Sequence, residues 1–484
     1  MKRITRWLIK TLLLGALLVA TLLLGWAFQS RSLPSLQSWH TETLASEFQA
    51  ADADSQTTLA DYLVREDNVF AELQKQVYDG TESSATTIFS RYRSGGPQDP
   101  AAVARNWNRS FELIPDNPRG GALLLHGLTD SPYSLRSIAQ MLYAKGYYVL
   151  GLRMPGHGTI PGALTQVHWE DWVAASRIGA RHVRARIGPE QPFVMAGYSN
   201  GGGLSVKYAL DALADSSLPR PDQLLLFSPE IGIAPIAVIS NSHKLLSFLP
   251  YFEKFKWLSV QPEYDPFKYN SFPKNAAQEA WEVTRAINVE IDARYKAGLL
   301  EEFPPVLTFL SWSDSTVKTE ETIRRLYDRL DDAGNELVVF DVNRYSELAG
   351  FLPSAQETAL DELLARSDLP YRLTVIGNVS DASEQLTERT KAPRTAVTDI
   401  NDMGVAWPQH VYSLAHVSIP FPPDDPVYGT RGARPDVYQG LPLGALQPRG
   451  ETNLLAAPMH QLMRLRHNPF FSYMEERILE TLNE

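Results

Sequence analysis

The fold is decided by residues 193–210, which read FVMAGYSNGGGLSVKYAL. The apolar run 193–196 predicts a buried strand, and residues 202–210 predict a helix. Between them lies Gly197-Tyr198-Ser199-Asn200-Gly201, and a strand, a Gly-x-Ser-x-Gly turn and a helix together form a nucleophile elbow. Such a turn is strained and lifts the serine hydroxyl off the sheet edge, where a base can reach it. The pentapeptide alone is a weak signal, but its setting between strand and helix predicts Ser199 as a nucleophile.

A second turn lies in residues 121–132, which read GALLLHGLTDSP. The apolar strand ends in His-Gly, the position at which an acyl hydrolase places a backbone donor for the oxyanion. The amides of Leu128 and Asn200 are therefore the candidate oxyanion donors, which stabilise charge that is present only in the transition state. We expect His126 to fix this loop rather than to take part in catalysis.

Three further segments lie between these two turns or close to them: residues 146–150 (GYYVL), 154–159 (MPGHGT) and 169–172 (WEDW). With these segments, residues 120–213 resemble the α/β-hydrolase superfamily, and most closely its bacterial carboxylesterase, monoacylglycerol lipase and serine aminopeptidase-like branch. The resemblance implies an α/β fold with a mostly parallel sheet flanked by helices and a mobile helical cap. It also implies a triad whose members follow in the order Ser, acid, His.

The acid is expected at the end of a later strand. Residues 304–312, PPVLTFLSW, predict that strand, and Asp314 follows it in a turn that matches the Asp-x-x-Val pattern of the family. Its carboxylate would hold the imidazole in one tautomer. Asp314 could instead only cap the helix predicted at 318–330, since aspartate is a good N-cap. Glu230, at the end of the apolar run 224–229, is the rival acid.

The base is expected in a loop after the last strand. His416 lies in residues 411–421, VYSLAHVSIPF, which resemble the histidine loop of related esterases. His410 is the alternative, and His460 and His467 lie farther along the chain. The triad therefore consists of Ser199, Asp314 and His416.

The chain departs from the family pattern in the 102 residues that separate Asp314 from His416 (416 − 314). Residues 336–342 and 371–377 predict two strands in this interval, and a polar stretch follows from 380 to 401. We therefore expect an insertion at about 345–405, before the histidine loop.

Composition excludes several classes of function. The chain has 484 residues, a net charge of −11 and no cysteine. The negative charge argues against a nucleic-acid partner. The absence of cysteine excludes disulfides, thiol catalysis and Cys-ligated metal sites. No motif implies a metal, a nucleotide or another cofactor.

The N-terminus is predicted to be a membrane-targeting segment. Lys2, Arg3 and Arg6 precede residues 11–28, which carry no charge and span about 27 Å as a helix. We expect an uncleaved, single-pass anchor in the inner membrane with a periplasmic catalytic domain. The alternative is a secreted or periplasmic protein after signal cleavage, although Trp26-Ala27-Phe28 is a poor cleavage site.

The expected organisation has three parts. Residues 1–30 form the anchor or signal segment, residues 31–105 a helical connecting region, and residues 106–484 the hydrolase domain. A cap insertion is expected at about 231–302, where aromatic residues line an acyl pocket, face a membrane surface or form the core of the cap.

The sequence as a whole predicts a serine hydrolase of carboxylic esters, with lipid-like or acylglycerol substrates favoured. Its expected partners are a small-molecule or lipid ester and, through the N-terminal helix, a membrane. A serine peptidase or amidase of the same fold remains an alternative, because the triad does not discriminate ester from amide. The second alternative is a non-catalytic, membrane-anchored binding protein on a hydrolase scaffold.

Overall fold

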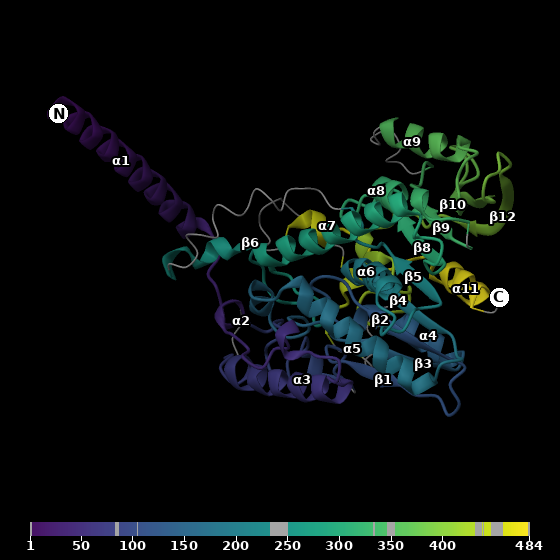
Figure 1. Ribbon diagram of the computed structural model, residues 1–484, viewed down its shortest axis with the longest axis horizontal. Coiled ribbons are helices and arrows are strands. Elements are labelled where there is room, and N and C mark those ends of the chain that lie inside the picture. The colour runs from purple at the N-terminus through teal and green to yellow at the C-terminus, as the bar shows by residue number, and fades with distance from the viewer. Residues whose placement is uncertain are drawn as a thin grey trace.

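The computed structural model describes residues 2–82, 87–103, 105–232, 250–332, 334–345, 354–430, 438, 440–446 and 458–482. Its centre is a ten-stranded sheet with the order β1-β3-β2-β4-β5-β8-β9-β10-β11-β12 (Figure 1). The strands are β1 (Phe111–Leu113), β2 (Gly120–Leu125), β3 (Tyr147–Leu152), β4 (Phe193–Tyr198), β5 (Gln223–Phe227), β8 (Val306–Ser311), β9 (Glu336–Phe340), β10 (Arg372–Asn378), β11 (Gln385–Lys391) and β12 (Asp399–Ala406). Neighbours from β3 to β10 pair in parallel, whereas β1, β11 and β12 pair antiparallel. The predicted α/β fold with a mostly parallel sheet is confirmed.

Helices cover both faces of the sheet, which explains why the central strands are buried and mostly apolar. Every residue of β2, β3, β4, β8 and β9 is buried. Along β2, Leu123 and Leu125 pack in one core and Ala122 and Leu124 in the other, as the two-residue period of a strand requires. The first core includes α5 (Trp169–Ile187), α6 (Asn200–Ala214), α7 (Lys274–Ala297), α8 (Thr319–Arg325) and α9 (Ser354–Ala365), and the second includes α4 (Arg136–Ala144) and α11 (Phe471–Thr481).

The long interval between Asp314 and His416 extends the sheet. After β9, the chain forms α9 and adds β10 in parallel, and then turns back twice to add β11 and β12. Both strands predicted in this interval are present, as β9 and β10. Residues 346–353 of the expected insertion lie outside the described residues.

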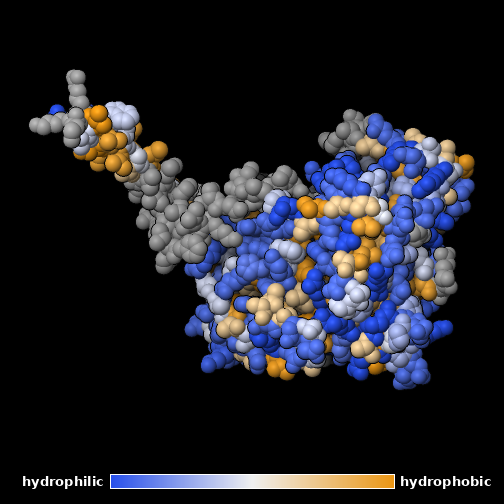
Figure 2. Space-filling view, in the orientation of Figure 1, coloured by the Kyte–Doolittle hydropathy of each residue, from blue (hydrophilic) through white to orange (hydrophobic). Residues whose placement is uncertain are grey.

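The N-terminal segment forms a helix, α1 (Lys2–Ser32). Its described apolar side chains are exposed, for example Leu12 at 72%, and they appear as hydrophobic surface in Figure 2. A membrane-spanning helix is nevertheless not supported, since no helix among the described residues is both long and apolar enough to cross a membrane. Several side chains of the run 11–28 lie outside the description.

The region that follows packs against the sheet domain. It contains α2 (Ser38–Thr41), α3 (Leu59–Leu73) and the π-helical turn η2 (Gln74–Tyr78), together with the short turns η1 (Ala50–Asp52) and η3 (Pro100–Ala102). Arg153, just after β3, is 1% exposed and forms ion pairs with Glu47 at 2.9 Å and Glu66 at 3.1 Å. Buried ion pairs thus join residues 31–105, which were expected to form only a connecting region, to the sheet.

Beyond residue 249, the expected cap contains η7 (Pro250–Lys256), the two-stranded pair β6 (Trp257–Ser259) and β7 (Phe272–Pro273), and α7. Residues 233–249 lie outside the described residues. The remaining elements are short: η4 (Pro132–Leu135), η5 (Pro161–Thr165), η8 (Tyr327–Arg329), η10 (His416–Ser418), η11 (Leu443–Ala445) and α10 (Met459–Leu462).

Candidate active site

Ser199 occupies the sharp turn between β4 and α6. Its φ is +53° and its ψ is −118°, a backbone conformation that residues other than glycine rarely adopt. The turn is held by hydrogen bonds from the Ser199 amide to the Phe227 carbonyl and from the Glu230 amide to the Ser199 carbonyl, both at 2.9 Å. A Cβ at Gly197 would lie 2.3 Å from the Gly201 carbonyl oxygen, and one at Gly201 would lie 1.9 Å from the Leu125 oxygen. Both glycines of the pentapeptide are therefore needed for the turn.

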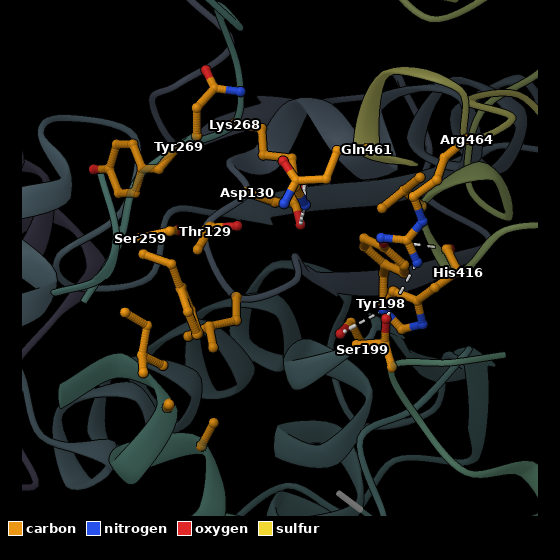
Figure 3. Close-up of a pocket in the computed structure, with 18 of the residues that line it drawn as sticks. Thr129, Asp130, Tyr198, Ser199, Ser259, Lys268, Tyr269, His416, Gln461 and Arg464 are labelled. Carbon is orange, nitrogen blue, oxygen red and sulfur yellow. Dashed lines mark hydrogen bonds and ion pairs between the residues drawn. The ribbon is translucent and has the colours of Figure 1, made fainter. Parts of the chain in front are cut away.

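The structure brings the three predicted triad residues together, and Figure 3 shows two of them, Ser199 and His416. His416 Nε2 lies 3.0 Å from Ser199 Oγ, and His416 Nδ1 lies 2.7 Å from Asp314 Oδ2. The other carboxylate oxygen of Asp314 accepts the amides of Thr316 at 2.8 Å and Val317 at 2.9 Å. Burial acts to raise the pKa of Asp314, but the His416 charge and these hydrogen bonds outweigh it and hold the pKa below its usual value. An ionised Asp314 fixes the proton of His416 on Nδ1 and leaves Nε2 free to accept the serine proton.

The loop that carries His416 is held by the ends of three strands. Leu414 accepts a 2.9 Å hydrogen bond from the Ser311 hydroxyl at the end of β8. Asn343, which follows β9, donates its amide to Tyr412 at 2.7 Å and its side chain to Val411 at 3.2 Å. The Asn343 side chain in turn accepts from Asn378 at the end of β10. These contacts hold the loop close to Ser199 after the chain has passed through β10, β11 and β12 at the edge of the sheet.

The two expected oxyanion donors lie at this end of the sheet. Leu128 lines the cavity that contains Ser199, and Asn200 is the first residue of α6. No group in the described ranges accepts a hydrogen bond from either backbone amide. Both N–H groups are therefore available to a ligand, that of Asn200 because it lies in the first turn of a helix.

His126 joins two loops. Its Nδ1 lies 2.9 Å from the Gly127 carbonyl, and its Nε2 accepts the Met154 amide at 3.0 Å. Because Nε2 accepts, Nδ1 carries the proton, and burial lowers the pKa of this imidazole well below its usual value. This geometry suits the loop-fixing role expected for it.

The rival acid Glu230 also lies near Ser199, but it does not contact His416. Its carboxyl group lines the same cavity and has no hydrogen bond or ion pair within the described part of the chain. Burial raises the pKa of Glu230 to about 7. Among the described side chains, neither His410 nor His460 nor His467 has a hydrogen bond to Ser199 or Asp314.

A cavity of about 510 Å³ opens at Ser199 and His416. Residues from the expected cap form much of its wall and attach to the loops beneath. The Tyr269 amide donates to Thr129 at 2.8 Å, and the Lys268 ammonium pairs with Asp130 at 3.1 Å. The cap side of the cavity is thus joined to the loop after β2, which carries Leu128.

Sequence reasoning missed several residues of this site. The Tyr198 ring lies 5.4 Å from the His416 ring, centre to centre, and Lys268, Gln461 and Arg464 line the cavity. Tyr198 is part of the quoted pentapeptide and could have been noticed. The other three lie in segments that no motif connects to Ser199, so only the fold identifies them.

One group of side chains could offer ligands to a metal. In the described part of the chain, ligand atoms of His168, Glu170 and Glu279 lie within 4.8 Å of one another. Glu279 already pairs with His168 and accepts the Trp169 amide. None of the three lines the Ser199 cavity.

Comparison with known proteins agrees with this architecture. A family model described as serine aminopeptidase, S33, matches residues 116–342, which include Ser199 and Asp314. The chain has an α/β-hydrolase fold. A thermostable monoacylglycerol lipase of Bacillus sp. (strain H-257) is 34% identical to the hydrolase over 94 residues. That match covers 19% of this chain and 36% of the relative, so the hydrolase spans only about a third of the length of the lipase.

Similar solved structures cover about half of the hydrolase. A metagenome-derived lipolytic enzyme of the LipS and LipT pair is 20% identical, and the match covers 53% of this chain and 97% of that one, with a TM-score of 0.38. The monoacylglycerol lipase of Paleococcus ferrophilus is 16% identical, with coverages of 52% and 97% and a TM-score of 0.36. Est1E from Butyrivibrio proteoclasticus with bound ferulic acid is 18% identical, with coverages of 53% and 95% and a TM-score of 0.32.

Proposed function

We propose that the hydrolase cleaves carboxylic esters through an acyl-enzyme on Ser199. The observation that carries the proposal is the continuous hydrogen-bonded series from Asp314 through His416 to the Ser199 hydroxyl. A serine hydroxyl is a weak nucleophile unless a base within hydrogen-bond reach removes its proton. The base in turn needs a partner that stabilises its charged form, and Asp314 fills this role.

The proposed reaction has two halves. In the first, His416 takes the Ser199 proton as the oxygen attacks the carbonyl, and the amides of Leu128 and Asn200 hold the oxyanion. The protonated His416 then gives its proton to the leaving alcohol. In the second half, His416 activates water, which hydrolyses the acyl-enzyme and frees Ser199.

We also propose a lipid-like ester of the acylglycerol type as the substrate. The similarity to monoacylglycerol lipases supports this proposal. The cavity is also lined in part by apolar residues of β6, β7 and α7, namely Leu258, Phe272, Ala277 and Ala280. A chain-length series of nitrophenyl esters tests the proposal, which expects kcat/KM to rise with acyl length. Equal rates for acetate and octanoate would contradict it.

The description of the matching family favours an aminopeptidase as the second candidate. A triad and an oxyanion site serve amides as well as esters, so the leaving group must be tested directly. Matched octanoyl esters and octanoyl anilides distinguish the two, and we expect the ester to react faster by at least about 10³-fold.

A further proposal concerns location. The basic start of the chain and the uncharged run 11–28 favour export of the catalytic part out of the cytoplasm. A reporter fused after residue 484 that is active only outside the cytoplasm tests this. Activity of a cytoplasmic reporter would contradict it, and the size of the mature chain shows whether the segment is removed.

The principal test is Ser199→Ala. We expect kcat to fall by roughly four to six orders of magnitude while the urea unfolding midpoint stays near that of the wild type. Ser217→Ala, at an exposed serine, is the matched control. A fluorophosphonate probe separates an enzyme from a silent scaffold, because it labels only an activated serine. Labelling of the wild type and of Ser217→Ala but not of Ser199→Ala is expected, and an unlabelled wild type would contradict the proposal.

A further inference from the structure

The cavity at Ser199 has a wall that carries basic side chains. Lys268, Arg464 and Arg466 all line it. Lys268 is paired with Asp130 at 3.1 Å, and Arg466 lies 3.7 Å from Asp265. Both of these cations therefore already have a carboxylate near them.

Arg464 differs from the other two. In the described part of the chain, its guanidinium has one hydrogen bond, to the Thr316 hydroxyl at 3.5 Å, and no carboxylate within ion-pair distance. A guanidinium has five N–H donors in a fixed, planar arrangement that suits a carboxylate or a phosphate. Most donors of Arg464 are thus available to a ligand in the cavity.

Arg464 also stands beside the reacting groups. Figure 3 shows it on the side of the cavity that holds His416, Tyr198 and Ser199, and its partner Thr316 is two residues from Asp314. Gln461, on α10, also lines the cavity. An anion held by Arg464 would therefore be close to the scissile bond.

The other side of the cavity is built differently. Figure 3 shows Ser259 and Tyr269 across the cavity from Arg464. Ser259 belongs to β6, which pairs with β7, and these strands and α7 contribute the apolar Leu258, Phe272, Ala277 and Ala280. Hydrocarbon is more stable against such a surface than against a guanidinium. The cavity therefore offers separate environments for an apolar chain and for a negative charge.

The described lining has two acidic residues, Asp130 and Glu230, and because Asp130 is paired with Lys268, Glu230 is the one that would oppose an anion. Its carboxyl has no basic partner, and because burial raises its pKa to about 7, much of it is uncharged at neutral pH. The repulsion is therefore partial and weakens as the pH falls.

We propose that the hydrolase takes esters whose alcohol portion carries an anionic group, a carboxylate or a phosphate, which Arg464 binds while the acyl chain lies against β6, β7 and α7. This inference rests on the proposed ester hydrolysis at Ser199 and names the substrate class. Arg464 is here a specificity residue: it binds the anion in the ground state and in the transition state alike, so it acts mainly on KM.

The test uses three octanoyl esters of one phenol scaffold. Two are anionic, 4-(octanoyloxy)benzoate and 4-(octanoyloxy)phenyl phosphate, and the methyl ester of the benzoate is the neutral partner. In Arg464→Gln, we expect KM for at least one anionic ester to rise about 10- to 100-fold, the effect of losing a hydrogen bond between charged groups. KM for the neutral ester should change less than about threefold. If KM rises for only one of the two anionic esters, that ester shows whether Arg464 binds a carboxylate or a phosphate.

Two variants control for charge and for general effects. Arg464→Lys keeps the charge without the planar donors, and its KM for the anionic esters should fall between those of the wild type and Arg464→Gln. Arg324→Gln removes an arginine whose side chain is 56% exposed on α8 and should match the wild type.

Two results would overturn the proposal. One is an equal change of KM for the charged and neutral esters in Arg464→Gln. The other concerns mono(4-nitrophenyl) glutarate, which carries its charge on the acyl side, compared with the neutral 4-nitrophenyl pentanoate. The proposal fails if Arg464→Gln raises KM for the glutarate relative to the pentanoate but does not raise KM for the anionic phenol esters. That outcome would assign the charge to the acyl side.

The two proposals can fail separately. If the wild type hydrolyses none of the esters, ester hydrolysis is wrong, and calorimetry then tests the anion site alone. 4-Hydroxybenzoate should bind the wild type at least 10-fold more tightly than Arg464→Gln, whereas its methyl ester should show no such difference. Equal binding of 4-hydroxybenzoate to both proteins would reject the anion site.

Discussion

The carboxyl groups of Asp314 and Glu230 are both buried at the sheet edge that carries Ser199, yet their pKa values move in opposite directions. Asp314 has His416 and two backbone amides as partners, and these hold its pKa low against the effect of burial. Glu230 has no such partners, so burial alone raises its pKa to about 7. Which of the two carboxyl groups can act as the acid therefore depends on the partners that it contacts in the folded structure, and these contacts cannot be read from the sequence.

Asp314→Asn should lower kcat by roughly 10³- to 10⁴-fold at neutral pH. Asparagine cannot stabilise the imidazolium and can favour the wrong tautomer of His416. Glu230→Gln should lower kcat far less, because Glu230 does not contact His416. Steady-state kinetics on one ester gives both values, and the opposite ranking would identify Glu230 as the acid.

Glu230 should make stability depend on pH. Its pKa is about 7 in the folded state and about 4.5 in the unfolded state, so the folded state holds the proton more tightly. The resulting stabilisation is fully present below about pH 4.5 and is lost as the pH rises through about 7. Relative to Glu230→Gln, the wild type should lose up to about 3 kcal/mol of unfolding free energy between about pH 4 and pH 8.

Urea unfolding of both proteins at several pH values measures this difference. Other buried acids, such as Glu263, contribute equally to both and cancel. Parallel pH profiles for wild type and Glu230→Gln would show that the Glu230 pKa is not raised.

At the scale of elements, the histidine loop depends on strands that lie beyond the middle of the sheet. Asn343 connects the loop to the ends of β9 and β10 through Tyr412, Val411 and Asn378. Ser311 does the same from β8. The position of His416 is therefore set by side chains that take no part in the chemistry.

Asn343→Ala should lower kcat by about 10-fold at a cost of only about 1–2 kcal/mol in stability, because the side-chain bonds that fix the loop are lost. Asn401→Ala, on the exposed strand β12, is the matched control and should leave kcat unchanged. The rate of fluorophosphonate labelling reports on His416 independently of substrate binding. Equal labelling of both variants would show that Asn343 does not hold the loop.

Much at this scale could be predicted from the sequence. The strands β2, β4, β5, β8 and β9 are short apolar runs because both of their faces are buried. The turn at Ser199 is local, and its glycines are required by contacts of the backbone with itself and with β2. For such features, the neighbouring residues carry enough information.

Contacts between distant segments could not be predicted. Asp130 and Lys268 are 138 residues apart in the sequence, and Arg153 and Glu47 are 106 apart. The sequence also suggested an insertion at 345–405, but not that β10 would pair with β9 and extend the sheet. Such pairings depend on which surfaces remain free after the central strands have packed, and a linear pattern does not record this.

At the scale of the whole molecule, the region before β1 is part of the folded unit. Glu66 accepts the Ser110 amide and hydroxyl as well as the Arg153 guanidinium, so three segments meet at one buried carboxylate. The Tyr62 hydroxyl donates to the Arg153 carbonyl. These contacts stabilise the loop after β3, next to the site.

Arg153→Met should destabilise the hydrolase by about 3–5 kcal/mol, because it leaves Glu47 and Glu66 without their cation in a buried position. Arg109→Met is the matched control, since its partner Asp67 is 75% exposed and such pairs contribute about 1 kcal/mol or less. Urea unfolding midpoints give both values. Equal shifts for the two variants would show that the buried network contributes no more than a surface pair.

The extension of the sheet has a consequence for biosynthesis. The ribosome makes the chain from its N-terminus, and domains take shape in that order. A growing polypeptide that has reached β9 already contains Ser199 and Asp314, whereas His416 is translated only after β10, β11 and β12. A chain interrupted anywhere in those three strands would contain Ser199 and Asp314 but not His416, the proposed proton acceptor. Under the proposed mechanism, Ser199 therefore has no base until His416 has been translated.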